Sequence, residues 1–172
     1  MKEIPLTQGK VAIVDDDDYE YLRQFKWYAT KNKSIFYVTR ASPRVNGKQT
    51  KLFMHRVIMD TPKGKQTDHI NHNGLDNRKQ NLRVCNSREN GYNWRKNKHK
   101  TTGFKGVHIH RQPSRRLGVS KGRVYEYIQA LIYYDNKVIN LGRNFKTLED
   151  AARAYNEAAI KYYGEFAQLN EI

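Results

Sequence analysis

The segment from Asp68 to Asn90 constrains this chain more than any other. It opens with an adjacent acid and imidazole, Asp68 and His69, and continues through residues 71–77, which are mostly Asn, Asp and Gly. These residue types tolerate left-handed backbone and form local side-chain hydrogen bonds, so a tight loop is expected there. A short apolar run, Leu82–Cys85, follows the loop. The pattern predicts two strands joined by a polar loop.

A helix is expected directly after the second strand. Asn86 and Glu89 have the spacing of a capping box, so the helix is predicted to begin there with Asn90 in its first turn. Successive residues on a strand point to opposite sides, so Asp68 and His69 can serve one site only at a strand end or bend. The loop that begins at Ile70 supplies such an end.

This ordered set suits the hydrolysis of a phosphodiester. That reaction needs a nucleophilic water, a cation on the phosphate oxygens and a scaffold that aligns them. The carboxylate of Asp68 suits magnesium, and the imidazole of His69 is the natural proton acceptor. An Asp-His pair alone is weak evidence, because most such pairs lie on surfaces or in ordinary hydrogen bonds. The whole set through Asn90 makes a phosphodiesterase the favoured interpretation.

Charge and composition indicate the partner. The net charge is +15 over 172 residues, and cations gain free energy by releasing the counterions condensed on nucleic-acid phosphates. No apolar run approaches the roughly 18 residues of a membrane span, and the N-terminus lacks the apolar region of a signal peptide. We therefore expect no membrane contact and an intracellular, cytoplasmic location. The single cysteine, Cys85, excludes an internal disulfide and a paired-cysteine zinc knuckle, and a small buried hydrophobe is its expected role.

The flanking regions have different patterns. Residues 1–54 are predicted to be rich in strands, with a run at Lys10–Val14, a helical segment at Tyr19–Phe25 and a hairpin of Ile35–Arg40 and Gln49–Met54. Asn46-Gly47 signals the turn of that hairpin. The four acids Asp15–Asp18 are expected to start the helix rather than bind a metal, because acids complement the positive end of the helix dipole.

The stretch from Gly91 to Arg123 contains no Asp or Glu. Its polar first part, with residues 96–102 as the linker proper, is predicted to follow a phosphate backbone, with a solvated basic loop as the alternative. Beyond it, Gly106–His110, Tyr125–Tyr134 and Lys137–Leu141 are predicted to be three strands. An alanine-rich helix is expected to follow, beginning near Thr147 and stopping at Gly164.

Asp68-His69, Asn81 and Asn90, with Asn-Gly-Leu-Asp-Asn between them, resemble the HNH family of endonucleases, whose ββα-metal motif would cover residues 55–95. The resemblance implies that Asp68 and Asn90 are metal ligands, His69 the general base and Asn81 the residue that fixes the loop. Many family members have histidine at the position of Asn90. The chain is thus more similar to phage and intron homing enzymes that bind one divalent ion through Asp and Asn, and Mg²⁺ or Mn²⁺ is expected rather than zinc or nickel.

His55 and Arg56 also lie in a segment that resembles this family. Arg56 is expected to hold the scissile phosphate or neutralise transition-state charge. For His55, a role in packing or in orienting the loop is expected equally with a role at the phosphate. His72 is expected to be a surface or DNA-facing residue rather than a metal ligand.

Residues 103–172 resemble the ethylene-response-factor type DNA-binding domain, which also occurs fused to phage and bacterial HNH nucleases. The resemblance rests on Lys105-Gly106-Val107, Leu141-Gly142 and the helix from Leu148 to Ala159. It implies a three-stranded sheet that enters the major groove, backed by one helix. The loop Gln112–Val124 is longer than in the family, and Tyr127-Ile128 stands near a common strand tryptophan. A basic α+β fold with no sequence preference is the alternative.

Together these patterns predict an α+β protein with a β-rich region 1–54, an HNH core 55–95, a linker 96–102 and a DNA-binding domain 103–172. Its expected activity is that of a homing-type endonuclease acting on double-stranded DNA as a monomer or dimer, with no small-molecule cofactor. The alternatives are a non-cleaving DNA-binding regulator and an RNA-binding protein. The candidate DNA contacts are Arg95, Lys96, Lys98, Lys100, Lys105, His108, His110, Arg111, Gln129, Tyr133 and Arg143.

Overall fold

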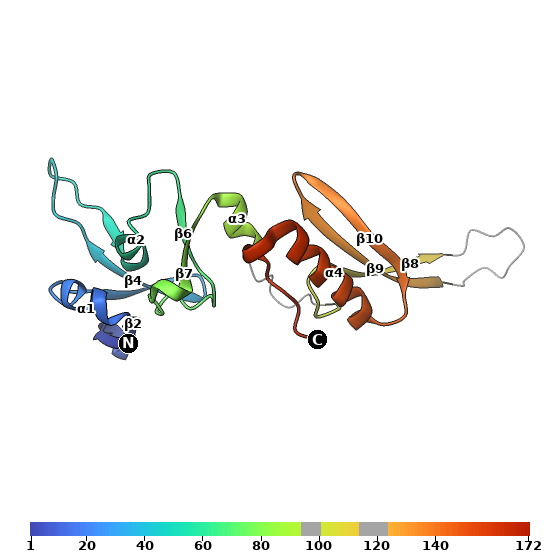
Figure 1. Ribbon diagram of the computed structural model, residues 1–172, viewed down its shortest axis with the longest axis horizontal. Helices are drawn as coiled ribbons and strands as arrows, with labels where there is room; N and C mark the ends of the chain where they lie inside the picture. The colour runs from blue at the N-terminus through green and yellow to red at the C-terminus, as the bar shows by residue number, and fades with distance from the viewer. Residues whose placement is uncertain (94–100, 114–123) are drawn as a thin grey trace, which may run out of the picture. The chain divides into compact units, whose positions relative to one another are not determined.

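The computed structural model describes residues 1–93, 101–113 and 124–172. Contacts divide the chain into two units, Met1–Asn90 and Gly91–Ile172. Each combines short helices with small antiparallel sheets, as expected for an α+β protein (Figure 1). No helix in the described ranges is both long and apolar enough to cross a membrane. The predicted linker 96–102 lies largely outside the described residues.

The first unit contains three small sheets. Two strands pair at the N-terminus, three follow in the order β3-β4-β5, and a hairpin of β6 and β7 completes the unit. The strands are β1 Lys2–Pro5, β2 Val11–Val14, β3 Tyr28–Asn32, β4 Ile35–Ala41, β5 Lys51–Phe53, β6 Gln66–His69 and β7 Leu82–Cys85. The helices are α1 Asp16–Leu22, α2 Met54–Ile58 and α3 Ser87–Tyr92, with 3-10 turns η1 Thr7–Gly9 and η2 Lys79–Asn81.

One apolar core joins the N-terminal sheets to α2. Val14, Leu22, Trp27, Val38 and Met54 are almost fully buried in it. Burial of a side chain of this size stabilises a fold by about 1.5–3 kcal/mol, so the cluster fixes β2, α1, β4 and α2 against one another. The predicted β-rich region and the segment that contains His55 are therefore packed together in one unit.

Local sequence signals explain most of these elements. The predicted strand at Lys10–Val14, the hairpin around Asn46-Gly47 and the hairpin of β6 and β7 are all present. The acids Asp15–Asp18 start α1 as predicted, with Asp15 as the N-cap residue, but the Asp15 side chain does not cap that helix. It accepts a hydrogen bond from the backbone N–H of Lys79 at 2.7 Å instead, which ties the helix start to the loop before β7.

The second unit is a three-stranded sheet with one helix packed on it. The strands β8 Val107–Pro113, β9 Val124–Tyr134 and β10 Lys137–Phe145 lie in the order β10-β9-β8. Helix α4 spans Leu148–Tyr163, and η3 spans Gly164–Phe166. Strands β8 and β10 end later than predicted, because cross-strand pairing extends the ladder beyond the apolar runs. Strand β8 begins one residue later than predicted, and β9 begins one residue earlier.

Capping and close packing place α4. Thr147 is the N-cap residue, and its hydroxyl accepts a hydrogen bond from Asp150 N–H, as predicted for this helix start. Ala151, Ala152 and Ala159 are buried against the sheet because their small side chains let the helix lie close to it. Gly106 has φ +76°, and a Cβ there would overlap the ring of Tyr155, so only glycine fits at this point.

Candidate active site

The hairpin of β6 and β7 carries the predicted acid and base. The register pairs Asp68 with Arg83 and His69 with Leu82, and alternation would turn the two side chains to opposite sides only within a continuing strand. Strand β6 ends at His69, and the backbone N–H of Ile70 bonds the carbonyl of Asn81 across the loop entry. The predicted strand end is therefore located at His69.

Asn81 fixes the loop between the two strands. Its amide Oδ1 accepts from Asn71 N–H at 3.0 Å, and its Nδ2 donates to the Asp76 carbonyl at 2.8 Å and to Asn71 Oδ1 at 3.0 Å. Asn81 is buried, and no other side chain of this size offers both a donor and an acceptor in one plane. The expected loop-fixing role therefore has a matching set of contacts.

The N-terminal strands hold the far side of the same loop. Ile13 N–H bonds the Leu75 carbonyl at 2.9 Å, and Asn77 N–H bonds the Ile13 carbonyl at 2.7 Å. Gly74 lies so close to Phe36 O and to Tyr37 that a Cβ could not be accommodated. These contacts could not be predicted from local patterns, because they join segments more than 30 residues apart.

His69 is enclosed by aromatic and amide side chains. It is 5% exposed, its ring centroid lies 4.8 Å from that of His55 and 6.0 Å from that of Tyr37, and its Nε2 lies 3.4 Å from Asn77 Oδ1. Burial lowers the pKa of His69 below 6.5, and the Asn77 contact and the charge of Asp68 offset this only in part. A neutral imidazole keeps one unprotonated ring nitrogen, which is the state that a general base requires.

His55 lies on α2, which directly follows the hairpin of β4 and β5, and its ring packs edge-on against that of His69. It is 7% exposed, and its Nδ1 has no hydrogen-bond partner in the described part of the chain. Burial, with the neighbouring His69 and Arg56, lowers the pKa of His55 to about 3. His55 is therefore an uncharged ring at neutral pH and adds no repulsive charge beside His69.

Asp68 forms a buried ion pair with Arg83. Its Oδ2 accepts from Arg83 Nε at 3.1 Å and Nη2 at 2.9 Å, and the two side chains are 10% and 9% exposed. Sequence reasoning missed Arg83, although its position opposite Asp68 in the register would have identified it. The arginine holds the carboxylate in a defined direction on the hairpin face that also carries Gln66.

Asn90 lies against that same face. The predicted capping box is present, with Asn86 N–H bonded to Glu89 Oε2 at 2.6 Å and Glu89 N–H bonded to Asn86 Oδ1 at 2.9 Å. In the first turn of α3, Asn90 Nδ2 donates to Gln66 Oε1 at 2.7 Å. Gln66 and Asp68 are two residues apart on β6, so Asn90 and Asp68 share one side of the hairpin.

The donor set on this face fits a hard divalent cation. Because Asn90 Nδ2 is bound to Gln66, its Oδ1 is oriented away from Gln66 and has no hydrogen bond among the described residues. A carboxylate and an amide oxygen are the ligand types that Mg²⁺ prefers, with water or substrate oxygens completing its shell. Among the described residues no three His, Cys, Asp or Glu side chains gather into a metal site.

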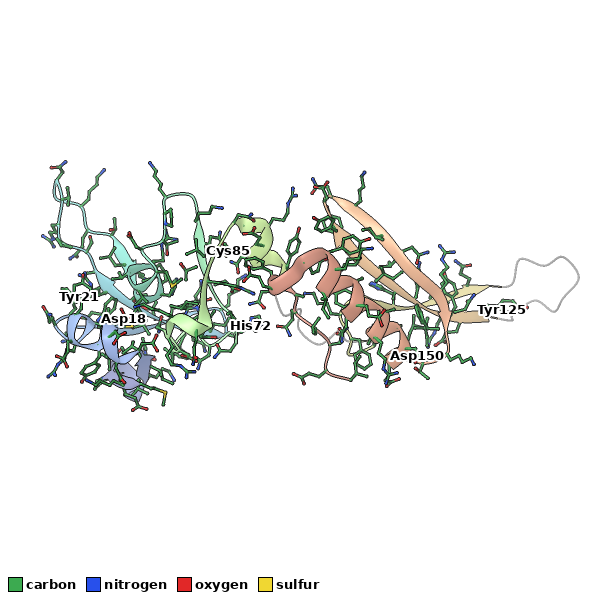
Figure 2. All side chains as sticks on the ribbon, viewed as in Figure 1. Asp18, Tyr21, His72, Cys85, Tyr125 and Asp150 are labelled. Carbon is green, nitrogen blue, oxygen red and sulfur yellow. The ribbon has the colours of Figure 1, made fainter. Side chains whose placement is uncertain are left out.

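Cys85 and Arg56 have structural contacts. Cys85 is buried at the end of β7, and burial with nearby negative charges raises the pKa of its thiol to about 11, which favours the protonated thiol (Figure 2). Arg56 Nη1 donates to the Lys65 carbonyl at 2.9 Å and so braces the connection between α2 and β6. The predicted phosphate contact of Arg56 stays a prediction. His72 lies in the loop, as expected, at φ +62°.

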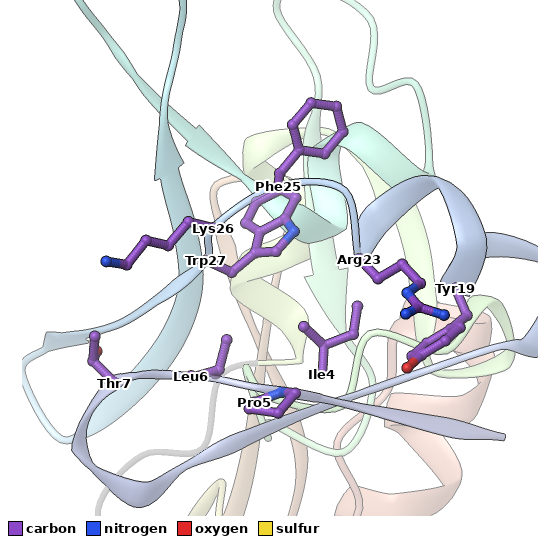
Figure 3. A pocket seen from close by; sticks show the side chains of 9 residues that line it. All are labelled: Ile4, Pro5, Leu6, Thr7, Tyr19, Arg23, Phe25, Lys26 and Trp27. Carbon is purple, nitrogen blue, oxygen red and sulfur yellow. The ribbon is translucent and has the colours of Figure 1, made fainter.

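A pocket of about 440 Å³ lies elsewhere in the first unit (Figure 3). Its lining comes from β1, η1, α1 and the segment that leads into β3, and includes Tyr19, Arg23 and Trp27. None of the predicted catalytic or metal-binding residues lines it. The candidate site at the hairpin is thus independent of this pocket.

The sheet of the second unit presents most of its candidate DNA contacts on one face. His108, Gln129 and Arg143 are register partners across the three strands. Val107 and Ala130, their strand neighbours, pack on α4, so these three residues face away from the helix. His110 and Tyr133 share that open face by the same alternation.

Contacts on the open face order its side chains. The His110 ring stacks on Tyr127 at 5.0 Å, and the Arg143 guanidinium lies 5.9 Å from the Tyr127 ring centroid. Gln129 is 5% exposed, and its Nε2 donates to Asn140 Oδ1 at 3.0 Å, so its amide is already engaged within the sheet. Tyr133, by contrast, is 56% exposed.

Other candidate contacts lie apart from that face. Arg111 faces the opposite side and forms an exposed ion pair with Glu126 at 3.0 Å. Lys105 precedes β8, and its Nζ donates to the Tyr92 carbonyl at 2.8 Å. Arg95, Lys96, Lys98 and Lys100 lie outside the described residues.

Comparisons with known proteins match the segment that contains the candidate site. Residues 53–92 match the model of the HNH endonuclease family. Over 167 residues the chain is 29% identical to an uncharacterized HNH endonuclease of Acanthamoeba polyphaga mimivirus, an alignment that covers 96% of this chain and 77% of the relative. No solved structure matches the chain. The chain thus contains an HNH endonuclease domain and is a nuclease enzyme, and this family implies action on DNA.

Proposed function

We propose that the protein is a metal-dependent, homing-type HNH endonuclease that nicks double-stranded DNA at the site formed by β6, its loop, β7 and α3. The observation that carries the proposal is the Asn90–Gln66 hydrogen bond, which holds the amide of α3 on the hairpin face of Asp68. The order of strand, loop, strand and helix corresponds to the ββα-metal motif. The family match over residues 53–92 supports the same reading.

Asp68 and Asn90 are the residues that would hold Mg²⁺ or Mn²⁺. When bound, the ion supplies positive charge to the non-bridging and leaving oxygens of the phosphate. Arg83 orients the Asp68 carboxylate, and Gln66 orients the Asn90 amide so that its oxygen is presented. With a single carboxylate in the set, we expect weak metal affinity until DNA contributes its own oxygens.

His69 is the proposed general base. Its low pKa leaves the imidazole neutral, and it accepts the proton from the attacking water. His55 and Tyr37 exclude bulk solvent from one side of the ring, while Asn77 restrains its orientation. Asn81 acts indirectly, because it fixes the loop that follows His69. Cleavage of the bond to the 3′ oxygen is proposed to leave 5′-phosphate and 3′-hydroxyl ends, in line with the family resemblance.

The second unit is proposed to bind duplex DNA through the open face of its sheet, as an ethylene-response-factor type domain does. The stacked His110, Tyr127 and Arg143 present aromatic edges and a cation there. A sheet of this kind fits the major groove. Exposed Tyr133 is a better candidate for a base contact than Gln129, whose amide is engaged.

Supercoiled plasmid tests the proposed activity. The wild-type protein is expected to convert it to nicked circle with Mg²⁺ or Mn²⁺ and to leave it intact in EDTA. An RNA of equal length should stay whole under the same conditions. Intact plasmid with every divalent metal, together with tight duplex binding, would favour a non-cleaving regulator. Preferential binding or cleavage of the RNA would favour the RNA-binding alternative.

A further inference from the structure

The first unit, like the stretch from Gly91 to Arg123, contains a region that has positive charges and no acids. Between Tyr21 and Met59 there is no Asp or Glu, while Lys and Arg occur nine times. Of these nine, only Arg23 forms an ion pair within the part of the chain that the structure describes, with Glu20 at 3.6 Å. The acids of the unit are used elsewhere, for example Asp18 with Lys79 at 3.0 Å.

Part of this region is a projecting hairpin arm, defined as residues 42–50, between β4 and β5. Every residue of the arm except Ser42 is exposed. Arg44 and Lys48 flank a turn in which Asn46 and Gly47 both have positive φ. Such a turn has a backbone twist that matches the right-handed twist of the two strands that it joins.

Hydrogen bonds order the arm although it has no core. Val45 N–H bonds the Lys48 carbonyl at 2.9 Å, and Lys48 N–H bonds the Val45 carbonyl at 3.0 Å. At the base, Thr50 N–H bonds Ser42 Oγ at 2.9 Å, and Gln49 Nε2 bonds the Ser42 carbonyl at 2.9 Å. The arm is therefore preorganised, and Val45, 68% exposed, is held out at its tip between the two cations.

Strand β4, which leads into the arm, contacts the candidate base, and β5, which leaves it, contacts the neighbouring His55. Tyr37 on β4 lies 6.0 Å from the His69 ring, and Phe53 on β5 lies 5.4 Å from the His55 ring. The eight residues from Tyr37 to Val45 span at most about 28 Å when extended. The DNA major groove is about 12 Å wide, and one helical turn is about 34 Å long. The tip thus comes within reach of phosphates no more than about one turn from a phosphate at His69.

From these observations we propose that the hairpin arm binds the phosphates that border a groove of duplex DNA next to the cleavage site, with Arg44 and Lys48 as the contacts. This inference rests on the proposed function and adds a third DNA-binding element to the nuclease site and the C-terminal sheet. The fit is chemical and geometric: a two-stranded ribbon enters a groove, its exposed cations meet the flanking phosphates, and Val45 contacts the groove itself.

The salt dependence of duplex binding tests the arm. Fluorescence anisotropy with a labelled duplex in EDTA measures affinity without cleavage. Each phosphate contact contributes about 0.9 to the slope of log K against log salt, so Arg44→Gln/Lys48→Gln should reduce the slope by about 2. The ratio of the duplex affinity at about 50 mM salt to that at about 200 mM salt should then be roughly tenfold smaller for the variant than for the wild type. Arg44→Lys/Lys48→Arg, which keeps both charges, should restore the slope.

The matched control is Arg153→Gln/Lys161→Gln, which removes the same charge from exposed positions on α4. Its slope should equal that of the wild type. An arm variant that is folded by thermal melting and binds with the wild-type slope overturns the proposal, as does an equal loss in the α4 control. Plasmid nicking by the wild type is measured in parallel, so a failure of the proposed nuclease activity is distinguished from a failure of the arm.

Discussion

Replacement of His69 by alanine is expected to slow plasmid nicking by about 10²–10⁴-fold, the usual contribution of a general base. That loss corresponds to about 3–5 kcal/mol of transition-state stabilisation. Asp68 and Asn90 remain in place in this variant, so duplex binding should change little. The rate is measured as conversion of supercoiled plasmid to nicked circle under single-turnover conditions with Mg²⁺.

His72→Asn is the matched control for that variant. His72 lies three residues further along the same loop at φ +62°, a conformation that asparagine tolerates. It should nick at close to the wild-type rate. If His69→Ala is folded and nicks as fast as this control, His69 is not the base.

The second large effect concerns stability. Arg83→Met should lower the free energy of unfolding by about 3–5 kcal/mol, because it leaves the Asp68 carboxylate buried without its partner. The measurement is urea denaturation followed by circular dichroism, with the wild type and variant compared at one pH and salt concentration.

Two further variants separate the ion pair from general effects of the substitution. Arg44→Met removes an exposed arginine from the arm and should change stability by no more than about 0.5 kcal/mol. Asp68→Asn/Arg83→Met should be more stable than Arg83→Met alone, since the unpaired charge is gone. Equal losses in Arg83→Met and Arg44→Met would show that the ion pair contributes nothing specific.

Local signals in the sequence identified the elements that position the site. The capping box of Asn86 and Glu89, the turn at Asn46-Gly47 and the N-cap Thr147 were all predictable, because each depends on residues three or fewer apart. The loop-fixing contacts of Asn81 were predicted from its resemblance to a family motif rather than from local rules.

Long-range partners could not be predicted in the same way. Asn77 beside His69, Gln66 beside Asn90 and Ile13 beside Leu75 are contacts whose members give no signal of one another in the chain. They depend on strand register and on packing between sheets, and both are established only when the whole unit folds. Helix α2 was missed because its five residues are too few for a helical period to stand out from the preceding strand.

The open face of the sheet in the second unit also could not be predicted from the sequence. Alternation along one strand separates His110 from Arg111, but only the packing of Val107 and Ala130 on α4 shows which of the two faces is open. The sequence therefore identified candidate DNA contacts, and the fold divided them between two sides.

The central claim is that Asp68 and Asn90 hold one divalent ion at which His69 supports cleavage. Its most direct test is the rate of plasmid nicking by Asp68→Asn as a function of Mg²⁺ concentration, next to the wild type. The claim predicts that the wild type nicks only with divalent metal, and that Asp68→Asn, though folded, stays inactive or needs far more Mg²⁺. Wild-type nicking by Asp68→Asn at the same Mg²⁺ concentration would contradict it.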